Sequence, residues 1–300
     1  MAMPGSSWGR YPLAEGQRLL WLSNRHAPLP QARGPVLGYG NGRSYGDSCL
    51  NPGGTVLQAR GLDRFISFDA AHGILECEAG VLISEVLELV VPRGWFLPVT
   101  PGTRMATIGG CIANDVHGKN HHTAGSFGRH VLDLELLRSD GRRIACSPHD
   151  DSSWFAATVG GLGLTGLIVR ARLQLRRIDS PWMRVGTQRF AHLGEFFALS
   201  AEHAGDEYNV AWVDCLARGA RLGRGVFFHG EHLREPGLTP PPATGDRLHV
   251  PFVSPVSLVN PASLRAFNTL YYHRAPAAPR IRHGHYLPFF YPLDAIGDWN

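Results

Sequence analysis

Glycine is concentrated in three segments of this chain, and that clustering constrains the fold more than any other feature of the sequence. The segments are residues 38–47, 100–118 and 160–166, called below the first, second and third glycine segments. Because glycine has no Cβ, it adopts left-handed backbone conformations and lets the backbone approach a neighbour closely. A lone cluster of this kind is typical of a surface loop, but three clusters between residues 38 and 166 predict that the segments contribute to one common site.

The first glycine segment is typical of a loop that binds an anion. Its four glycines allow successive backbone N–H groups to point at one anion. Arg43 and Ser44 add donors that suit a phosphate. Arg43 and Tyr45 stand where a dinucleotide-binding fingerprint needs its third glycine, so the segment is neither that fingerprint nor a Walker loop.

The second and third segments indicate a ligand that is extended and partly flat. Small residues dominate positions 106–113, and such a stretch can lie against a planar ring or a pyrophosphate without side-chain interference. The third segment precedes a predicted strand, where glycine again indicates close backbone approach. Together the three segments predict one extended, anionic, partly planar ligand, and FAD or another dinucleotide fits that description.

Composition excludes several other classes of protein. The net charge is +4, but no basic run is long enough for a nucleic-acid-binding tail. The five cysteines are odd in number and form no CxxC pair, so we expect no disulfide framework and a reducing, cytoplasmic location. No stretch approaches 18 apolar residues and the first ten residues hold no apolar signal core, so we expect no integral membrane segment.

Hydrophobic patterning predicts an α+β fold of mixed strands and helices. Hairpins at the turns 70–73 and 139–141 favour antiparallel pairing over a doubly wound sheet. The texture of the sequence changes near residue 179, where we place a domain boundary. Strands are expected at 55–58, 65–69, 74–79, 131–138, 142–146, 167–175, 183–188, 208–216 and 225–229, helices at 81–91, 152–158 and 193–203, and a loop over 236–261.

A histidine-rich run ends the second glycine segment and continues beyond it. His117 and His121, with His122 and Asp115 close by, are residue types that bind metals. Gly118 makes a helix improbable here, and no Cys or carboxylate stands at a familiar zinc spacing. We therefore predict a polar wall of a site and no metal, and we expect each of the remaining histidines on the solvated surface.

Tyr45 and Lys119 also lie inside these segments. Tyr45 fits either simple aromatic packing or a site residue, and Lys119 fits either a solvated charge or a site residue.

Several motifs together are familiar. They are Gly40-x-Gly-Arg-Ser-Tyr-Gly-Asp47, Thr100-Pro-Gly-Thr103, residues 109–122, and His117-Gly-Lys-Asn-His-His122 followed by Ala124-Gly-Ser-Phe-Gly128. In combination they resemble the FAD-binding oxidoreductases of the vanillyl-alcohol oxidase/p-cresol methylhydroxylase (PCMH) type. The resemblance is dense over residues 36–176 and thinner beyond, at 211–214 and 289–294.

The resemblance implies a PCMH-type FAD-binding domain over residues 1–178 and an antiparallel-sheet substrate domain over 179–300. The second domain is expected to be incomplete, because relatives are considerably longer. Some relatives attach FAD through a histidine at the position of Arg43, so non-covalent FAD is implied here. The implied cofactor-binding residues are Gly38, Tyr39, Gly40, Asn41, Gly42, Arg43, Ser44, Tyr45, Gly46, Asp47, Gly102, Thr103, Thr107, Ile108, Gly109, Gly110, Asn114, Asp115, Val116, His117 and Ile168.

The implied reaction oxidises a secondary alcohol of a sugar. A hydride passes to flavin N5 while a base takes the hydroxyl proton, and Tyr45, His117 and Lys119 are the implied catalytic residues. A lipid- or nucleotide-linked pentose that leads to cell-wall arabinan is the implied substrate, with a reductase partner completing a two-step epimerisation and the protein at the membrane periphery. The alternatives are a sugar-lactone or alditol oxidase that uses oxygen, and a truncated flavin-fold module that does not catalyse.

Overall fold

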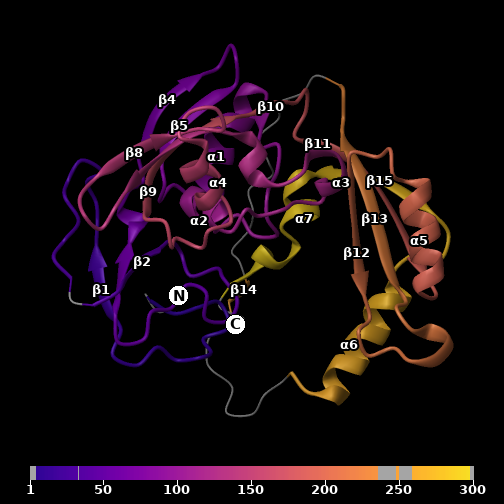
Figure 1. Cartoon of the computed structure of the whole chain (residues 1–300). Coiled ribbons are helices and arrows are strands. Elements are labelled where there is room, and N and C mark those ends of the chain that lie inside the picture. The colour runs from indigo at the N-terminus through magenta and orange to yellow at the C-terminus, as the bar shows by residue number, and fades with distance from the viewer. Residues whose placement is uncertain (1–4, 33, 236–247, 250–258, 298–300) are drawn as a thin grey trace. The chain divides into compact units, whose positions relative to one another are not determined.

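The computed structural model describes residues 5–32, 34–235, 248–249 and 259–297. These residues form two compact units, traced in Figure 1. The first unit runs up to Ile178 and also takes in the segment that begins at Leu293, and the second unit runs from Asp179 to Pro292. Both units contain strands and helices, so the α+β prediction is confirmed. The role assigned to each domain stays a prediction.

A small parallel sheet lies in the amino-terminal part of the first unit, with strand order β1-β3-β2. The central strand β3 is buried along its whole length, as its apolar run Val56–Leu57 requires. The prediction of β3 is confirmed, and the apolar run at 36–37 begins β2. The strand β1 was missed, because its four residues show no clear alternation. The strands are β1 (Arg18–Trp21), β2 (Val36–Tyr39) and β3 (Thr55–Gln58).

A five-stranded antiparallel sheet forms the rest of this unit, in the order β4-β5-β9-β7-β8. Both predicted hairpins are present, β4 with β5 and β7 with β8. Along β9, residues Val169, Ala171 and Leu173 are buried while Arg170 and Arg172 are not, as the alternation predicts. The strands are β4 (Phe65–Asp69), β5 (Ile74–Glu78), β7 (Val131–Leu137), β8 (Arg143–Cys146) and β9 (Leu167–Gln174).

Short helices connect these strands. The predicted helices at 81–91 and 152–158 are present. Asp151, which precedes the second of them, has a φ of +47° and makes no side-chain capping bond. The helices of this unit are α1 (Ile83–Val90), α2 (Ile108–Ala113), α3 (His121–Ala124) and α4 (Ser152–Thr158), with 3-10 turns η1 (Ala59–Gly61), η2 (Val91–Arg93) and η3 (Phe127–His130). Two-residue strands β6 (Trp95–Phe96) and β10 (Arg176–Arg177) pair with each other.

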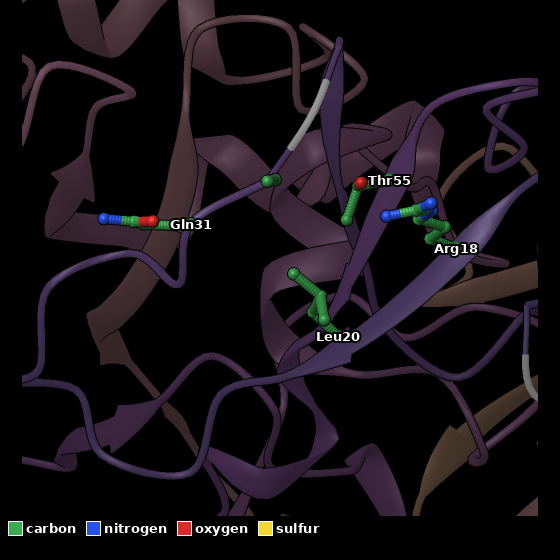
Figure 2. A pocket seen from close by; sticks show the side chains of 5 residues that line it. Arg18, Leu20, Gln31 and Thr55 are labelled. Atoms are coloured by element: carbon green, nitrogen blue, oxygen red, sulfur yellow. The ribbon is translucent and has the colours of Figure 1, made fainter.

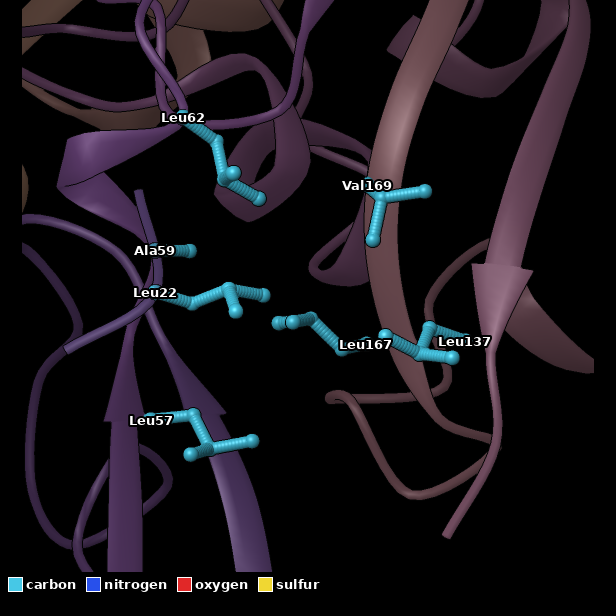
Figure 3. Packing of buried hydrophobic residues seen from close by; sticks show 7 residues of the cluster. All are labelled: Leu22, Leu57, Ala59, Leu62, Leu137, Leu167 and Val169. Atoms are coloured by element: carbon cyan, nitrogen blue, oxygen red, sulfur yellow. The ribbon is translucent and has the colours of Figure 1, made fainter. Parts of the chain in front are cut away.

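One apolar cluster joins the two sheets of the first unit. Figure 3 shows side chains from β3 and its surroundings meeting side chains from β7 and β9. Each fully buried leucine of this kind stabilises the fold by about 1.5–3 kcal/mol. The cluster therefore packs the parallel sheet against strand β9. The first glycine segment continues from a strand of that sheet, and the third glycine segment precedes β9. Its members are Leu22, Leu57, Ala59, Leu62, Leu137, Leu167 and Val169.

The second unit is built on a four-stranded antiparallel sheet in the order β12-β13-β11-β15. Helix α5 contacts β11 and β13, and the predicted strands and the predicted helix at 193–203 are confirmed. The later helices α6 and α7 and strand β15 were not predicted. The elements are β11 (Trp182–Phe190), α5 (Leu193–Glu202), β12 (Tyr208–Val213), η4 (Gly219–Arg221), β13 (Gly225–His232), α6 (Pro261–Arg274), β15 (Arg280–His285) and α7 (Tyr286–Phe290).

The predicted loop over 236–261 lies mostly outside the described residues. Within it the structure describes the two-residue strand β14 (Leu248–His249), and α6 begins at its last position. The chain continues past α7 through η5 (Pro292–Ala295) and β16 (Ile296–Gly297). Among the described helices, none combines the length and the apolar character that crossing a membrane requires.

Candidate functional site

The first and second glycine segments are packed directly against each other. The Asn41 side-chain amide donates to the backbone carbonyl of Met105 at 2.7 Å. A Cβ placed on Gly40 would lie only 2.4 Å from Thr107 Oγ1, so this approach requires glycine. The structure thus brings together two segments whose midpoints are more than sixty residues apart.

The third glycine segment joins the same assembly. Gly160 and Leu162 donate backbone hydrogen bonds to the carbonyls of Ile112 and Ala113, at 3.0 and 2.8 Å. A Cβ on Gly163 would lie 4.0 Å from the backbone nitrogen of Gly38, which leads into the first segment. All three segments therefore converge in the first unit.

Tyr39 fixes the start of the first segment. Its hydroxyl donates to the carbonyl of Ser6 at 2.7 Å, and burial raises the pKa of Tyr39 to about 12, so the phenol stays neutral. Gly42 has a φ of +60°, and a Cβ there would lie 2.2 Å from this hydroxyl. The loop thus turns tightly beside Tyr39. Tyr45, further along, is 79% exposed, so it is not the packed core aromatic that was one alternative.

Part of the site backbone borders open space. A Cβ added at Gly46 or at Gly102 would meet no heavy atom within 4 Å. Bare backbone beside empty volume is what a ligand with phosphates and a flat ring needs, since N–H groups can then reach it without obstruction. The backbone at these two glycines is therefore open to a ligand, and the residues of these segments fit FAD.

A carboxylate from much later in the chain holds the Thr100–Thr103 motif. Asp294 accepts hydrogen bonds from the Thr103 hydroxyl at 2.7 Å and from the backbone nitrogen of Arg104 at 2.8 Å. Asp294 belongs to the first unit although 190 residues separate it from Arg104. Sequence reasoning missed this residue, because only the weak resemblance at 289–294 pointed to it.

Helix α2 places the small residues of the second segment. Thr107 caps this helix by accepting from the backbone nitrogen of Gly110 at 3.1 Å. The predicted residue Ile108 is fully buried, and Ile168 in β9 is 5% exposed, so both act through packing in this structure. Asn114 ends the helix and donates through its side chain to the carbonyl of Gly110.

The backbone between α2 and η3 has a strained conformation that several hydrogen bonds stabilise. Asp115 has a φ of +41°, and its carboxylate accepts from the backbone nitrogen of Gly128 at 2.9 Å. Val116 donates to the carbonyl of Cys111, and it accepts from the nitrogen of Phe127. A positive φ at a non-glycine residue costs about 1–3 kcal/mol and is concentrated at functional sites.

The histidine-rich run differs from prediction in one respect. A short helix, α3, begins at His121, so a helix does form inside the run, with Asn120 as its N-cap. His117 precedes it and pairs with Ser126 in an isolated bridge. The rings of His117 and His121 lie edge to face at 5.9 Å, and both residues are exposed. The run forms a polar surface here.

Lys119 has an unusual position for its residue type. It is the only lysine among the 29 Lys and Arg residues, and its side chain is mostly buried. Burial lowers the pKa of Lys119 to about 8. Because burial disfavours the charged form, the ammonium group of a buried lysine loses its proton more easily. Such lysines are typical of sites that bind an anion or transfer a proton. The alternative of a solvated surface charge is therefore wrong.

A separate pocket of about 240 Å³ opens on the parallel sheet. Figure 2 shows Arg18, Leu20 and Thr55 on the strands, with Gln31 from a loop. The buried hydroxyl of Thr55 has no hydrogen-bond partner among the described residues. None of the lining residues belongs to residues 38–47, 100–118 or 160–166, so this pocket is distinct from the glycine segments.

The comparisons with known proteins agree with this site. Residues 27–147 match the family described as the FAD binding domain, so they include all of the first glycine segment and all of the second. The chain therefore carries an FAD-binding domain of the PCMH type, with FAD as its cofactor.

Individual relatives are similar over different lengths. The chain is 34% identical to decaprenylphosphoryl-beta-D-ribose oxidase of Mycolicibacterium smegmatis over 275 residues, 88% of this chain and 60% of that protein. It is 39% identical over 216 residues to an uncharacterized protein of Streptomyces coelicolor, covering 68% of this chain and 58% of that protein. Cytokinin dehydrogenase 8 of rice is 30% identical over 178 residues, 55% of this chain and 34% of that protein. The chain thus spans about 60% of the length of the first two relatives.

Proposed function

We propose that this chain is the FAD-binding part of an oxidoreductase that oxidises a secondary alcohol of a sugar. The convergence of the three glycine segments around bare backbone is the observation that carries the proposal. The similarity to an enzyme named for decaprenylphosphoryl-beta-D-ribose supports a pentose linked to a lipid phosphate as the substrate class.

In this proposal the first segment, Gly38–Asp47, holds the pyrophosphate. Gly102, Thr103, Thr107, Gly109 and Gly110 lie along the rest of the cofactor, together with residues 114–117. The attachment is non-covalent, because Arg43 stands at the position from which some relatives form the bond. Arg43 lies over the ring of Trp8, with 4.9 Å between guanidinium carbon and ring centroid.

Three side chains are proposed to act on the substrate. Bound FAD supplies the hydride acceptor at N5. Lys119, protonated at neutral pH, pairs with the substrate phosphate, and the exposed imidazole of His117 orients substrate by hydrogen bonding. Tyr45 offers an exposed phenol within the first segment. Which group takes the hydroxyl proton depends on how the substrate lies.

A lipid-linked substrate requires the enzyme to approach a membrane surface, and the net charge of +4 favours approach to anionic headgroups. A cytoplasmic location at the membrane periphery and a role in making an arabinan precursor belong to the same proposal. A reductase partner stays a prediction.

The test is spectroscopic. The purified chain, supplied with FAD and desalted, is expected to be yellow with absorbance at about 450 nm, and acid precipitation is expected to release the flavin into the supernatant. Anaerobic addition of a polyprenylphosphoryl pentose is expected to bleach that band. A chain that takes up no FAD contradicts the proposal.

The same assay separates the alternatives. Peroxide formed in air from free aldonolactones or alditols, with no bleaching by the lipid-linked pentose, identifies a lactone or alditol oxidase instead. A chain that binds FAD but is bleached by none of these substrates is a binding module. If the flavin stays with the acid-precipitated protein, only the proposal of non-covalent attachment is contradicted, and the rest of the proposed function stands.

A further inference from the structure

Two histidines of the second unit converge on one carboxylate. The Nδ1 atoms of His203 and His229 lie 2.8 and 2.5 Å from the same oxygen, Oδ2 of Asp206. The three residues come from different elements: His203 ends α5, Asp206 lies in the turn that follows, and His229 lies within β13. The expectation that these histidines lie on the solvated surface is wrong, since their side chains are only 20% and 13% exposed.

The cluster is held by the fold rather than by its own bonds alone. The carbonyl of His203 accepts from Asn209 Nδ2 at 2.6 Å and from the backbone nitrogen of Asp206 at 3.0 Å. These two bonds fix the turn that carries the carboxylate. Asn209 is also paired with His229 across β12 and β13, so one side chain ties the turn to the sheet.

Gly186 of β11 makes room for the His229 ring. A Cβ at position 186 would lie 1.8 Å from His229 Nε2, so the ring lies over bare backbone. Nε2 therefore faces the sheet, and Nδ1 is the nitrogen turned toward Asp206 and His203. The two imidazole rings lie 3.8 Å apart between centroids, tilted by 33°.

We propose that His203, Asp206 and His229 form a binding site for a divalent cation of the Zn²⁺ class. One ligand atom from each of the three lies within 4.8 Å of the other two, and two imidazole nitrogens with a carboxylate oxygen are a ligand set that suits such a cation. The cation replaces the two Nδ1 protons, and each neutral imidazole then carries its proton on Nε2. A small outward movement of the rings opens the site to metal–ligand distances of about 2.0–2.2 Å.

The surroundings suit a bound cation. Asp206 is 38% exposed at its side chain, so the site has a path to solvent and room for water as a fourth ligand. Arg184, a cation near enough to act on His229, is paired with Glu231 at 3.7 Å. A metal here would join the end of α5 to the β12–β13 hairpin and stabilise the second unit.

The test uses the full chain freed of metal with a chelator. Calorimetric titration with Zn²⁺ is expected to show one site that binds one equivalent of the ion. In His229→Ala and Asp206→Asn this site is expected to be lost or to bind Zn²⁺ more than about tenfold more weakly. Co²⁺ in place of Zn²⁺ is expected to give visible absorption of a four-coordinate ion, absent from both variants.

His192→Ser is the matched control. It removes an imidazole from the opposite end of α5 and keeps a side chain that caps the helix, so the one-equivalent site should be unchanged. Circular dichroism establishes whether each variant is folded. If His229→Ala is not folded, Asp206→Asn, which keeps the shape of the residue, is the variant that tests the site. Absence of a one-equivalent site, or a site retained in folded Asp206→Asn, overturns the proposal.

Discussion

Lys119 is a mostly buried amine in a chain whose other strongly basic side chains are all arginines. Its pKa of about 8 means that the folded protein holds this proton less tightly than the unfolded chain does. Between pH 8 and the ordinary pKa of about 10.4 the unfolded state binds more protons, so this residue makes stability rise with pH there. At neutral pH the burial of this charge is therefore a cost to stability, which an anionic ligand beside Lys119 would reduce.

Lys119→Met is therefore expected to raise the free energy of unfolding at pH 7 by about 2–3 kcal/mol, with the gain vanishing near pH 10.5. Urea unfolding at both pH values measures this. Arg142→Met, which removes an exposed cation, should change stability by no more than about 0.5 kcal/mol. Because the chain has one lysine, ¹³C-dimethylation gives one side-chain NMR signal, and a titration midpoint near 10.5 would contradict the expectation.

Asp214 illustrates a buried ion pair that serves the fold. Its Oδ2 accepts two hydrogen bonds from Arg224 at 2.9 and 2.8 Å, and its Oδ1 accepts one from Asn268 of α6 at 2.7 Å. Burial acts to raise the pKa of Asp214, but the bonds from Arg224 and Asn268 outweigh it and lower that pKa. The stability that this carboxylate supplies is present above its ordinary pKa and is lost as pH falls through the lowered one.

Asp214→Ala is expected to lower the free energy of unfolding by about 3–5 kcal/mol, because it leaves the Arg224 charge buried without its partner. Denaturant unfolding followed through the second unit measures this. Glu231→Ala, which breaks the exposed pair with Arg184, should cost less than about 1 kcal/mol. Equal losses in the two variants would show that the burial of the pair does not matter.

At the scale of elements, strands and helices with clear periodicity were predictable. The hairpin β4–β5 and helix α1 follow from alternation and 3.6-residue spacing, which depend only on local sequence. Helix α6 was missed, because its residues are mostly exposed and carry little apolar periodicity.

The candidate site likewise has parts that could be predicted from the sequence and parts that could not. The glycine segments could be found from composition, because bare backbone is a local property. The Asp294 contact and the His203–Asp206–His229 cluster could not, because each depends on residues that meet only after the chain has folded.

Gly40→Ala tests whether the first and second glycine segments must touch. The added methyl would lie 2.4 Å from Thr107 Oγ1, so either the Thr107 side chain must leave its capping position or the two segments must separate. FAD affinity is expected to fall by more than about tenfold, the equivalent of about 1.4 kcal/mol. Gly9→Ala, at a glycine with open space around it, should bind FAD normally. Fluorescence quenching of FAD on titration measures both, and equal affinities would mean that the contact is dispensable.

At the scale of the molecule, the two units should respond differently to the cofactor. FAD at a hundred times its dissociation constant is expected to raise the free energy of unfolding of the first unit by about 2.7 kcal/mol. Hydrogen exchange followed by mass spectrometry should slow in the three glycine segments and stay unchanged in β11, β12 and β13. Slowing confined to the second unit would contradict the placement of FAD.

The contact of Asp294 with Thr103 and Arg104 bears on how this protein emerges from the ribosome. At about 5–20 residues per second, the 190 residues between Arg104 and Asp294 take roughly 10–40 s to be translated. Throughout that interval the nascent chain has the second glycine segment but not the carboxylate that holds it. The unit translated first is therefore completed last, and the whole intervening unit is synthesised while that segment waits for its partner.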